Sequence, residues 1–252
     1  RFKRMKPERA HWLLTGANLM VALAAWGVCR LVFGDGYLAQ AAFFVGIMPT
    51  ATAAPVVMGL LGGSVEFMLT ALLLINGIIC ALLPFILPAV VGRGDFEIYL
   101  NVAQNISLVM LLPLALALAA RRFYPRAIAW PRKLKDVTFG IWVVILVLIA
   151  ANASYDISSR EGISERVLEQ IGVIALLVCG VNFGLGYLLG GRTRAAECSQ
   201  ALGQKNTTLS IYLALTYASP IAALGPTFYV LWHNLWNAWQ LYRASERKRR
   251  DG

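Results

Sequence analysis

The sequence predicts an all-α polytopic membrane protein, and three observations support this prediction. Of the 252 residues, 58% are hydrophobic and only 14% are charged. Several apolar runs reach the roughly 20 residues that a helix needs to cross a hydrocarbon core of about 30 Å. Runs such as FGIWVVILVLIAANA lack the alternation of polar and apolar residues that marks the strands of a membrane barrel. We therefore expect a bundle of membrane-spanning helices.

Charged clusters divide the chain into eight apolar segments, each expected to form one span. Their limits are 11–33, 37–62, 65–91, 96–120, 137–155, 165–190, 196–218 and 221–242. If the spans alternate in direction, eighteen of the 23 Lys and Arg residues fall on one side and four on the other. Because cytoplasmic loops are enriched in Lys and Arg, both ends of the chain are expected in the cytoplasm. The expected location is the plasma membrane, in a bacterium the inner membrane.

Two of these segments are interrupted near their centres. In the second segment, residues 49–55 read PTATAAP, and the two prolines remove backbone donors. In the seventh, residues 203–206 read GQKN and place Lys205 inside a span. An ionised side chain at that depth costs ~3 kcal/mol on insertion scales and indicates a functional site by default. A plain proline kink is the alternative interpretation of the first interruption.

The two interruptions occupy equivalent positions in two groups of three segments. Pro49 and Gly203 each lie 38 residues after the start of their group, at residue 11 and at residue 165. Five spans separate the two starts, so the groups have opposite orientations and form an inverted repeat. Two broken helices that cross near the membrane midplane are typical of secondary transporters. The predicted domains are a first core triplet at 1–92, panel helices at 93–160 and a second core triplet at 161–252.

Polar side chains at the two breaks are candidates for a binding site. Helix N-termini that meet at a crossing carry partial positive charge, which suits an anion or a polar head group. The side chains near these termini that can form hydrogen bonds are Thr50, Thr52, Asn206, Thr207 and Thr208. In the last segment, a polar face consists of His233, Asn237 and Gln240, with Asn234 beside them. We interpret the neighbouring stripe of Trp232, Trp236 and Trp239 as lipid-facing.

Lys205 allows three interpretations. Its side chain reaches the interface, pairs with a buried carboxylate, or stands in a cation site as a tethered ammonium. A position about nine residues into the span makes the first difficult. Glu66 and Glu197 are both expected near the cytoplasmic face, so neither is an obvious partner. A buried amine can also release its proton, which leaves a proton-linked role chemically open.

The sequence offers little support for other functions. It has no Ser-His-Asp order, no metal-ligand spacing and no phosphate loop, so we expect no enzyme activity, metal or cofactor. The cysteines lack CxxC spacing and are interpreted as packing residues: Cys29, Cys80, Cys179 and Cys198. The net charge of +10 lies in short loops and is interpreted as a topology signal, so nucleic acid is not an expected partner.

Four motifs, in this order, resemble the bile acid sodium symporter family. They are KPERAHWLLTGAN in the first segment, Met48–Pro49 at the first break, GQKN at the second and VLWHN in the last segment. VNFGLGYLLG in the sixth segment is also similar to the family. The resemblance covers nearly the whole chain and implies ten helices, with six in the core and four in the panel. The first segment resembles the family's third helix, so two further panel helices are expected before Arg1.

The family's sodium ligands have no counterparts here. The matching positions lack the hard oxygen ligands in their side chains that a small cation requires: Ala54, Pro55, Met68, Leu72 and Ala201. Lys205 replaces a Gln of the family, and its ammonium can supply the positive charge that a bound sodium ion otherwise supplies. The family's substrate contacts match at Thr52, Asn206, His233 and Asn234. Asn18 and Gln204 are further candidates.

These residues predict a secondary transporter of an organic anion, bile-acid-like or a small carboxylate, that works by alternating access. Transport is expected to be independent of sodium, and either facilitated or linked to protons through Lys205. Two alternatives stay open: a transport-inactive binding or sensory membrane protein, and a sodium-coupled symporter with substitute ligands. The expected partners are a small organic anion and the lipid bilayer.

Overall fold

The computed structural model describes residues 6–124 and 164–251, with isolated positions between these two ranges. The structure is nearly all helical, at 87%. It divides into two compact units, Arg1–Ala81 with Gly162–Gly252, and Leu82–Glu161. Apart from isolated positions, the expected segment 137–155 lies outside the described residues.

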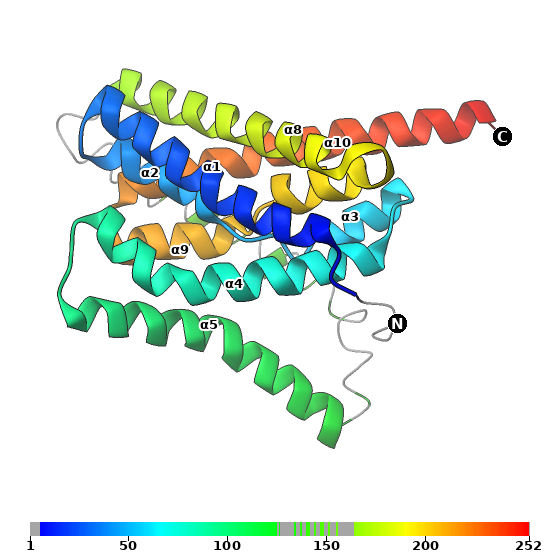
Figure 1. Ribbon diagram of the computed structural model, residues 1–252, viewed down its shortest axis with the longest axis horizontal. Coiled ribbons are helices and arrows are strands. Elements are labelled where there is room, and N and C mark those ends of the chain that lie inside the picture. Colours follow the sequence, from blue (N-terminus) through cyan, green and yellow to red (C-terminus); the bar gives the residue numbers. More distant parts are fainter. Residues whose placement is uncertain are drawn as a thin grey trace. The chain divides into compact units, whose positions relative to one another are not determined.

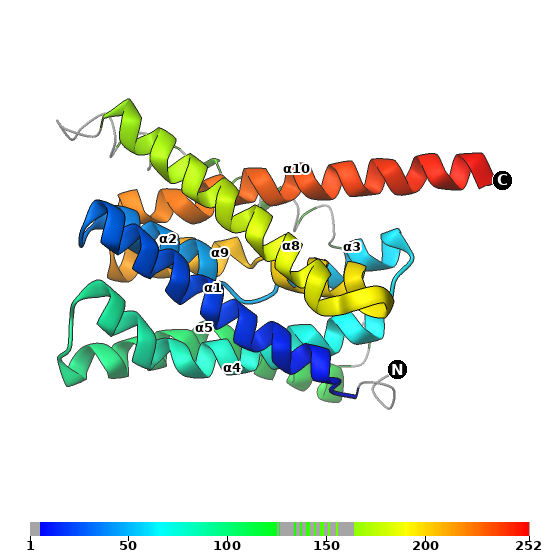
Figure 2. The same ribbon diagram turned by 45° about the horizontal axis from the view of Figure 1, so that its top comes forward.

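The first unit contains most of the described helices (Figures 1 and 2). They are α1 (Arg9–Phe33), α2 (Tyr37–Ile47), α3 (Ala54–Leu61), the first part of α4 (Val65–Val91), α8 (Glu165–Gly203), α9 (Thr207–Tyr217) and α10 (Pro220–Asp251). The second unit contains the end of α4 and α5 (Phe96–Phe123). Among the described residues, three helices are long and apolar enough to cross a membrane: α1, α4 and α8.

The helix α2 forms the centre of the first unit. Nine of its eleven residues are buried, and it packs against α1, α8, α9 and α10. Close packing against α1 depends on Gly46, because a Cβ there would lie 3.0 Å from the backbone nitrogen of Ala22. A short helix that is apolar on all sides is expected at such a buried position.

The helix α8 turns back on itself between the two segments expected at 165–190 and 196–218, so the expected boundary is confirmed. The turn lies between Gly191, which has φ 57°, and Arg194, which has non-helical angles. Only glycine adopts such a positive φ without strain. The parts before and after the turn approach closely: a Cβ on Gly190 would lie 2.7 Å from the backbone of Ala195. The turn therefore brings the end of α8 back into the interior of the unit.

Candidate functional site

The two interrupted segments meet and pair through their backbones. Between α2 and α3, the chain is unwound from Met48 to Ala53, and between α8 and α9 it is unwound from Gln204 to Asn206. The Ala51 N–H donates to the Gln204 carbonyl at 2.8 Å, and the Asn206 N–H donates to the Pro49 carbonyl at 2.9 Å. These bonds form an isolated antiparallel bridge. Backbone groups that lost their helical partners at the breaks are thereby satisfied.

The C-terminal end of α2 is closed by side chains from three other segments. The last carbonyls of a helix have no partner within it. Ser210 Oγ donates to the Phe44 carbonyl at 2.7 Å, Lys205 Nζ to the Gly46 carbonyl at 3.2 Å, and Asn18 Nδ2 to the Ile47 carbonyl at 3.1 Å. The sequence placed Lys205 inside a span, and the structure places its amine at this helix end.

Lys205 is almost completely buried, with 1% of its surface exposed. Its amine also donates to Asn18 Oδ1. In the part of the chain that the structure describes, no carboxylate pairs with it: Glu197 pairs with Arg194 at 3.5 Å, and Glu66 forms no ion pair. A cation is favoured at a helix C-terminus because the helix dipole is negative there. The amine therefore neither reaches the interface nor pairs with a carboxylate of the described residues, and the third interpretation, a tethered ammonium, stays a prediction.

The C-terminal end of α8 is closed by neutral hydroxyl groups. Thr50 Oγ1 donates to the Ala201 carbonyl at 2.7 Å, and the Tyr229 hydroxyl donates to the Gly203 carbonyl at 2.7 Å. The Tyr229 hydroxyl in turn accepts from Asn182 Nδ2 at 3.3 Å. Sequence reasoning missed Tyr229, which is fully buried. A tyrosine in an apolar segment was the available signal, because its hydroxyl needs a partner when buried.

The N-terminal ends of the half-helices differ from each other. Asn206 caps α9, because its Oδ1 accepts from the Leu209 N–H at 3.3 Å. At α3, no side chain caps the first turn, and Pro55 lies within that turn. The helix terminus at α9 already has its own acceptor. Of the two N-terminal ends, only that of α3 lacks a side-chain cap.

The predicted site residues differ in their surroundings. Thr50, Lys205, Asn206 and Asn18 take part in the contacts at the crossing, whereas Thr52 and Asn234 are exposed and outside them. Other predicted positions are buried: Ala54, Pro55, Met68, Ala201, Gln204, Thr207 and His233. Leu72 and Thr208 are partly or fully exposed.

Several buried polar atoms near the crossing have no partner among the described residues. A buried polar atom without a hydrogen bond costs about 1–3 kcal/mol, so water or a ligand is expected there. His233 lies next to the residues at the end of α8, because its ring packs edge-on against the ring of Tyr229, with 5.5 Å between the ring centres. These atoms without a partner are Asn182 Oδ1 and Gln200 Oε1 in α8, Gln204 Oε1 in the unwound segment and His233 Nδ1 in α10.

The polar face of α10 turns towards α8. Gln200 Nε2 donates to Asn237 Oδ1 at 3.0 Å and to Gln240 Oε1. The predicted polar face is thus in contact with another helix. The neighbouring tryptophan stripe lines a groove between the same two helices, a detail that the lipid-facing interpretation did not include.

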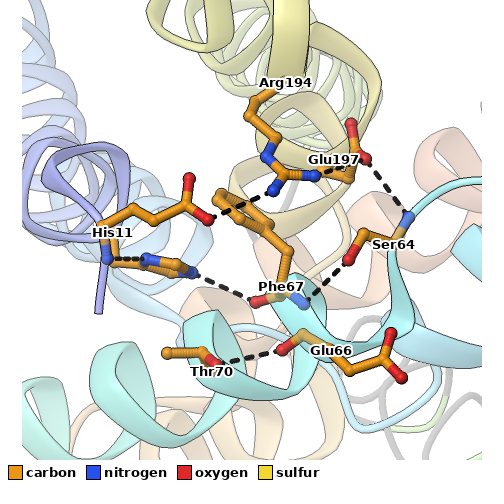
Figure 3. Close-up of polar contacts among 8 residues, drawn as sticks. His11, Ser64, Glu66, Phe67, Thr70, Arg194 and Glu197 are labelled. Atoms are coloured by element: carbon orange, nitrogen blue, oxygen red, sulfur yellow. Dashed lines mark hydrogen bonds and ion pairs between the residues drawn. The ribbon is translucent and has the colours of Figure 1, made fainter. Parts of the chain in front are cut away.

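A polar cluster joins the start of α1, the start of α4 and the turn of α8 (Figure 3). Arg194 pairs with Glu8 at 3.1 Å and with Glu197 at 3.5 Å, and its guanidinium lies 5.0 Å from the ring centre of Phe67. His11 Nε2 lies 3.1 Å from the Phe67 carbonyl. The motif KPERAHWLLTGAN therefore contributes Glu8 and His11 to a structural junction.

Comparisons with protein families and with curated proteins found no relative, because no model of a protein family and no curated protein matches this sequence. The resemblance to the bile acid sodium symporter family rests on its motifs and stays a prediction.

Proposed function

We propose that this protein is a secondary transporter of an organic anion and that Lys205 supplies the fixed positive charge of its binding site. One observation carries the proposal: a buried amine lies at the crossing of two broken helices, and no carboxylate pairs with it in the described residues. An ammonium in such a place has lost several kcal/mol of hydration. An anion that reaches the crossing compensates part of this loss.

The hydrogen bonds of Lys205 also favour a ligand. An ammonium carries three N–H donors, and two of them bond to Asn18 and to the Gly46 carbonyl. The third is available for a carboxylate or sulfonate oxygen. Hydrogen bonds to charged groups contribute about 1.5–3 kcal/mol, which is enough to orient a small anion. The unpartnered amide and imidazole atoms nearby can bond to its other polar groups or to water.

Sodium independence follows from the same amine. The last carbonyls of α2 have no partner within the helix and therefore favour a cation, and the Lys205 amine occupies that position. The resemblance assigns the family's sodium ligands to positions such as Ala54, Met68 and Ala201, which have no side-chain oxygen. We therefore propose that the tethered ammonium replaces a bound ion. A facilitated carrier and a proton-linked carrier both fit this arrangement.

We further propose eight spans in an inverted repeat, in the plasma membrane, with both ends of the chain cytoplasmic. The equal offsets of Pro49 and Gly203 and the pairing of the two breaks support this arrangement. The resemblance supplies the panel at 93–160, against which the core would move in alternating access.

Ligand-induced thermal stabilisation tests the proposed site. The purified protein is heated with a short carboxylate, a medium-chain carboxylate or a bile acid, in sodium or in potassium. We expect at least one anion to raise Tm equally in both salts, and Lys205→Met to remove this response. The matched control is Tyr229→Phe, which removes a buried hydrogen bond without removing charge and should keep the response. Stabilisation by sodium alone would contradict the proposal and favour a symporter with substitute ligands.

Counterflow in liposomes then separates a transporter from a binding protein. Vesicles loaded with unlabelled anion should accumulate labelled anion through the native protein and not through Lys205→Met. A ligand that stabilises the native protein without any counterflow would favour the transport-inactive alternative. Repeating the assay with a pH gradient distinguishes a proton-linked carrier, which would respond to the gradient, from a facilitated one.

A further inference from the structure

A long groove runs between α8 and α10, on two helices that lie side by side in the first unit (Figures 1 and 2). Its volume is about 1140 Å³, which exceeds the ~300–1,000 Å³ of most small-molecule pockets. Aromatic side chains from both helices line it, among them Phe183, Tyr187, Trp232 and Trp236. The positions that the family resemblance assigns to substrate contacts do not line this groove, although Gln240 of the polar face of α10 does.

The groove has an apolar part of a defined length. From Trp232 to Arg243 the helix α10 advances eleven residues, or about 16 Å at 1.5 Å per residue. This is about half of a hydrocarbon core of ~30 Å, which is the depth of one leaflet. An acyl chain that enters from one surface therefore has matching apolar contacts along this distance.

The end of the groove is positively charged. Arg243 and Arg247 line it, and the Arg243 guanidinium lies 4.9 Å from the ring centre of Trp239. Within the described ranges neither guanidinium forms an ion pair with a carboxylate; the nearby Glu246 pairs with Arg249 at 3.5 Å. Arginine binds phosphate through two parallel hydrogen bonds, so this end suits a phosphate group.

The charged end lies where lipid head groups are expected. With 32 residues, α10 is about 48 Å long and exceeds the thickness of a hydrocarbon core. Its C-terminal part, which carries Arg243 and Arg247, extends past the neighbouring helices of its unit (Figure 1). Basic residues at the cytoplasmic end of a membrane helix attract anionic lipids.

We propose that this groove binds an anionic phospholipid of the cytoplasmic leaflet. One acyl chain lies along Phe183, Trp232 and Trp236, and the phosphate contacts Arg243 and Arg247. The apolar part is about as long as one leaflet is deep, and the positive charge lies at its end, where the phosphate of a bilayer lipid would lie. Both features favour a bilayer lipid over a soluble anion. The inference rests on the proposed insertion of α10 into a membrane with its C-terminal end in the cytoplasm, and not on transport, so it can fail or hold independently of the proposed anion transport.

Tryptophan fluorescence provides the test. The protein has seven tryptophans; replacing Trp12, Trp26, Trp130 and Trp142 by Phe leaves the three on the groove. This protein is placed in zwitterionic vesicles with small fractions of brominated phosphatidylglycerol or brominated phosphatidylcholine, whose chains quench tryptophan on contact. We expect half-maximal quenching at about tenfold lower mole fraction for the anionic lipid. The preference should decrease in 1 M salt, which shortens the Debye length to about 3 Å.

Two variants with the same change of net charge identify the arginines. Arg243→Gln with Arg247→Gln should bring quenching by the anionic lipid to the level of the zwitterionic lipid. Arg9→Gln with Arg192→Gln, at exposed positions outside the groove, should keep the preference. Equal quenching by both lipids in the starting protein would overturn the proposal. An anionic preference that persists without Arg243 and Arg247 would overturn it as well.

Discussion

The ends of α2 and α8 present the same physical problem and solve it differently. At each end, a helix stops in the interior and leaves carbonyl groups without helical partners. At α8, two neutral hydroxyls close the end, from Thr50 and Tyr229. At α2, a hydroxyl, an amide and a buried amine close it, from Ser210, Asn18 and Lys205.

The difference between the two ends is the basis of a proposal about their roles. The end of α8 demonstrates that neutral donors are sufficient to satisfy carbonyls of this kind. The ammonium at the end of α2 adds a cost of dehydration that capping alone does not require. We therefore associate the charged end with binding and the neutral end with stability, and the following changes test this division.

The largest effect is expected for Lys205→Met on anion affinity. Methionine keeps the length and volume of the side chain and removes the charge. Loss of a charge-assisted hydrogen bond of about 1.5–3 kcal/mol predicts an affinity between about 10-fold and 100-fold lower. The change in unfolding free energy should be smaller, because relief from the buried charge offsets the carbonyl left unpaired. Isothermal titration and chemical unfolding measure the two quantities; unchanged affinity would contradict the division.

The next largest effect is expected for Tyr229→Phe on stability. This change leaves the Gly203 carbonyl and the Asn182 amide without their common partner. Nothing offsets the loss, so the free energy of unfolding should fall by about 1–3 kcal/mol. Affinity for the anion should stay within about twofold of the native value. If Tyr229→Phe lowered both the unfolding free energy and the anion affinity as much as Lys205→Met does, the two ends would not differ in function.

A smaller and equal effect is expected for the hydroxyls at the two ends. Thr50→Val removes one donor at α8, and Ser210→Ala removes one at α2. Each should lower the unfolding free energy by about 1 kcal/mol, because both hydroxyls are neutral and buried. In the double variant, the two losses of unfolding free energy should add if the two ends act independently. Thr216→Val, which removes an exposed hydroxyl, is the control and should have no effect.

The smallest effect is expected for Asn206→Ala. The Asn206 side chain caps α9 through a long bond of 3.3 Å and is partly exposed. Loss of the cap should lower stability by about 0.5 kcal/mol, the lower end of the usual range. The same change tests the contact that the family resemblance assigns to Asn206: if the side chain also binds the anion, affinity falls while stability hardly changes.

The sequence was sufficient to locate the helices and the two breaks. Proline at residues 49 and 55, a charge at residue 205 and the charged clusters between apolar runs are local signals. The described helix ends lie close to the expected limits, except that α10 continues to Asp251, nine residues beyond the expected end at residue 242. The turn within α8 also lies where the sequence placed a boundary, because Gly191 and Arg194 fall between the expected segments 165–190 and 196–218. Gly191 with its positive φ allows the chain to reverse with little interruption of the helix.

The partners at the site could not be predicted in the same way. Tyr229, Asn182 and Ser210 contact the helix ends from positions far along the chain, and no local pattern relates them. Periodicity placed the tryptophans on one face of α10 but did not say what that face meets. Thr52 and Asn234, assigned by resemblance, lie on the surface of the described unit. A helical pattern predicts a face, whereas its neighbours depend on the tertiary arrangement.

The bridge between the two breaks consists of main-chain atoms alone. Pro49 contributes a carbonyl, and Ala51, Gln204 and Asn206 contribute groups that nearly every amino acid has. The joint between the two broken helices is therefore largely independent of the side chains that surround it. Side chains at this point can therefore be exchanged, a hydroxyl for an amide for example, without removing the main-chain hydrogen bonds that join the two broken helices.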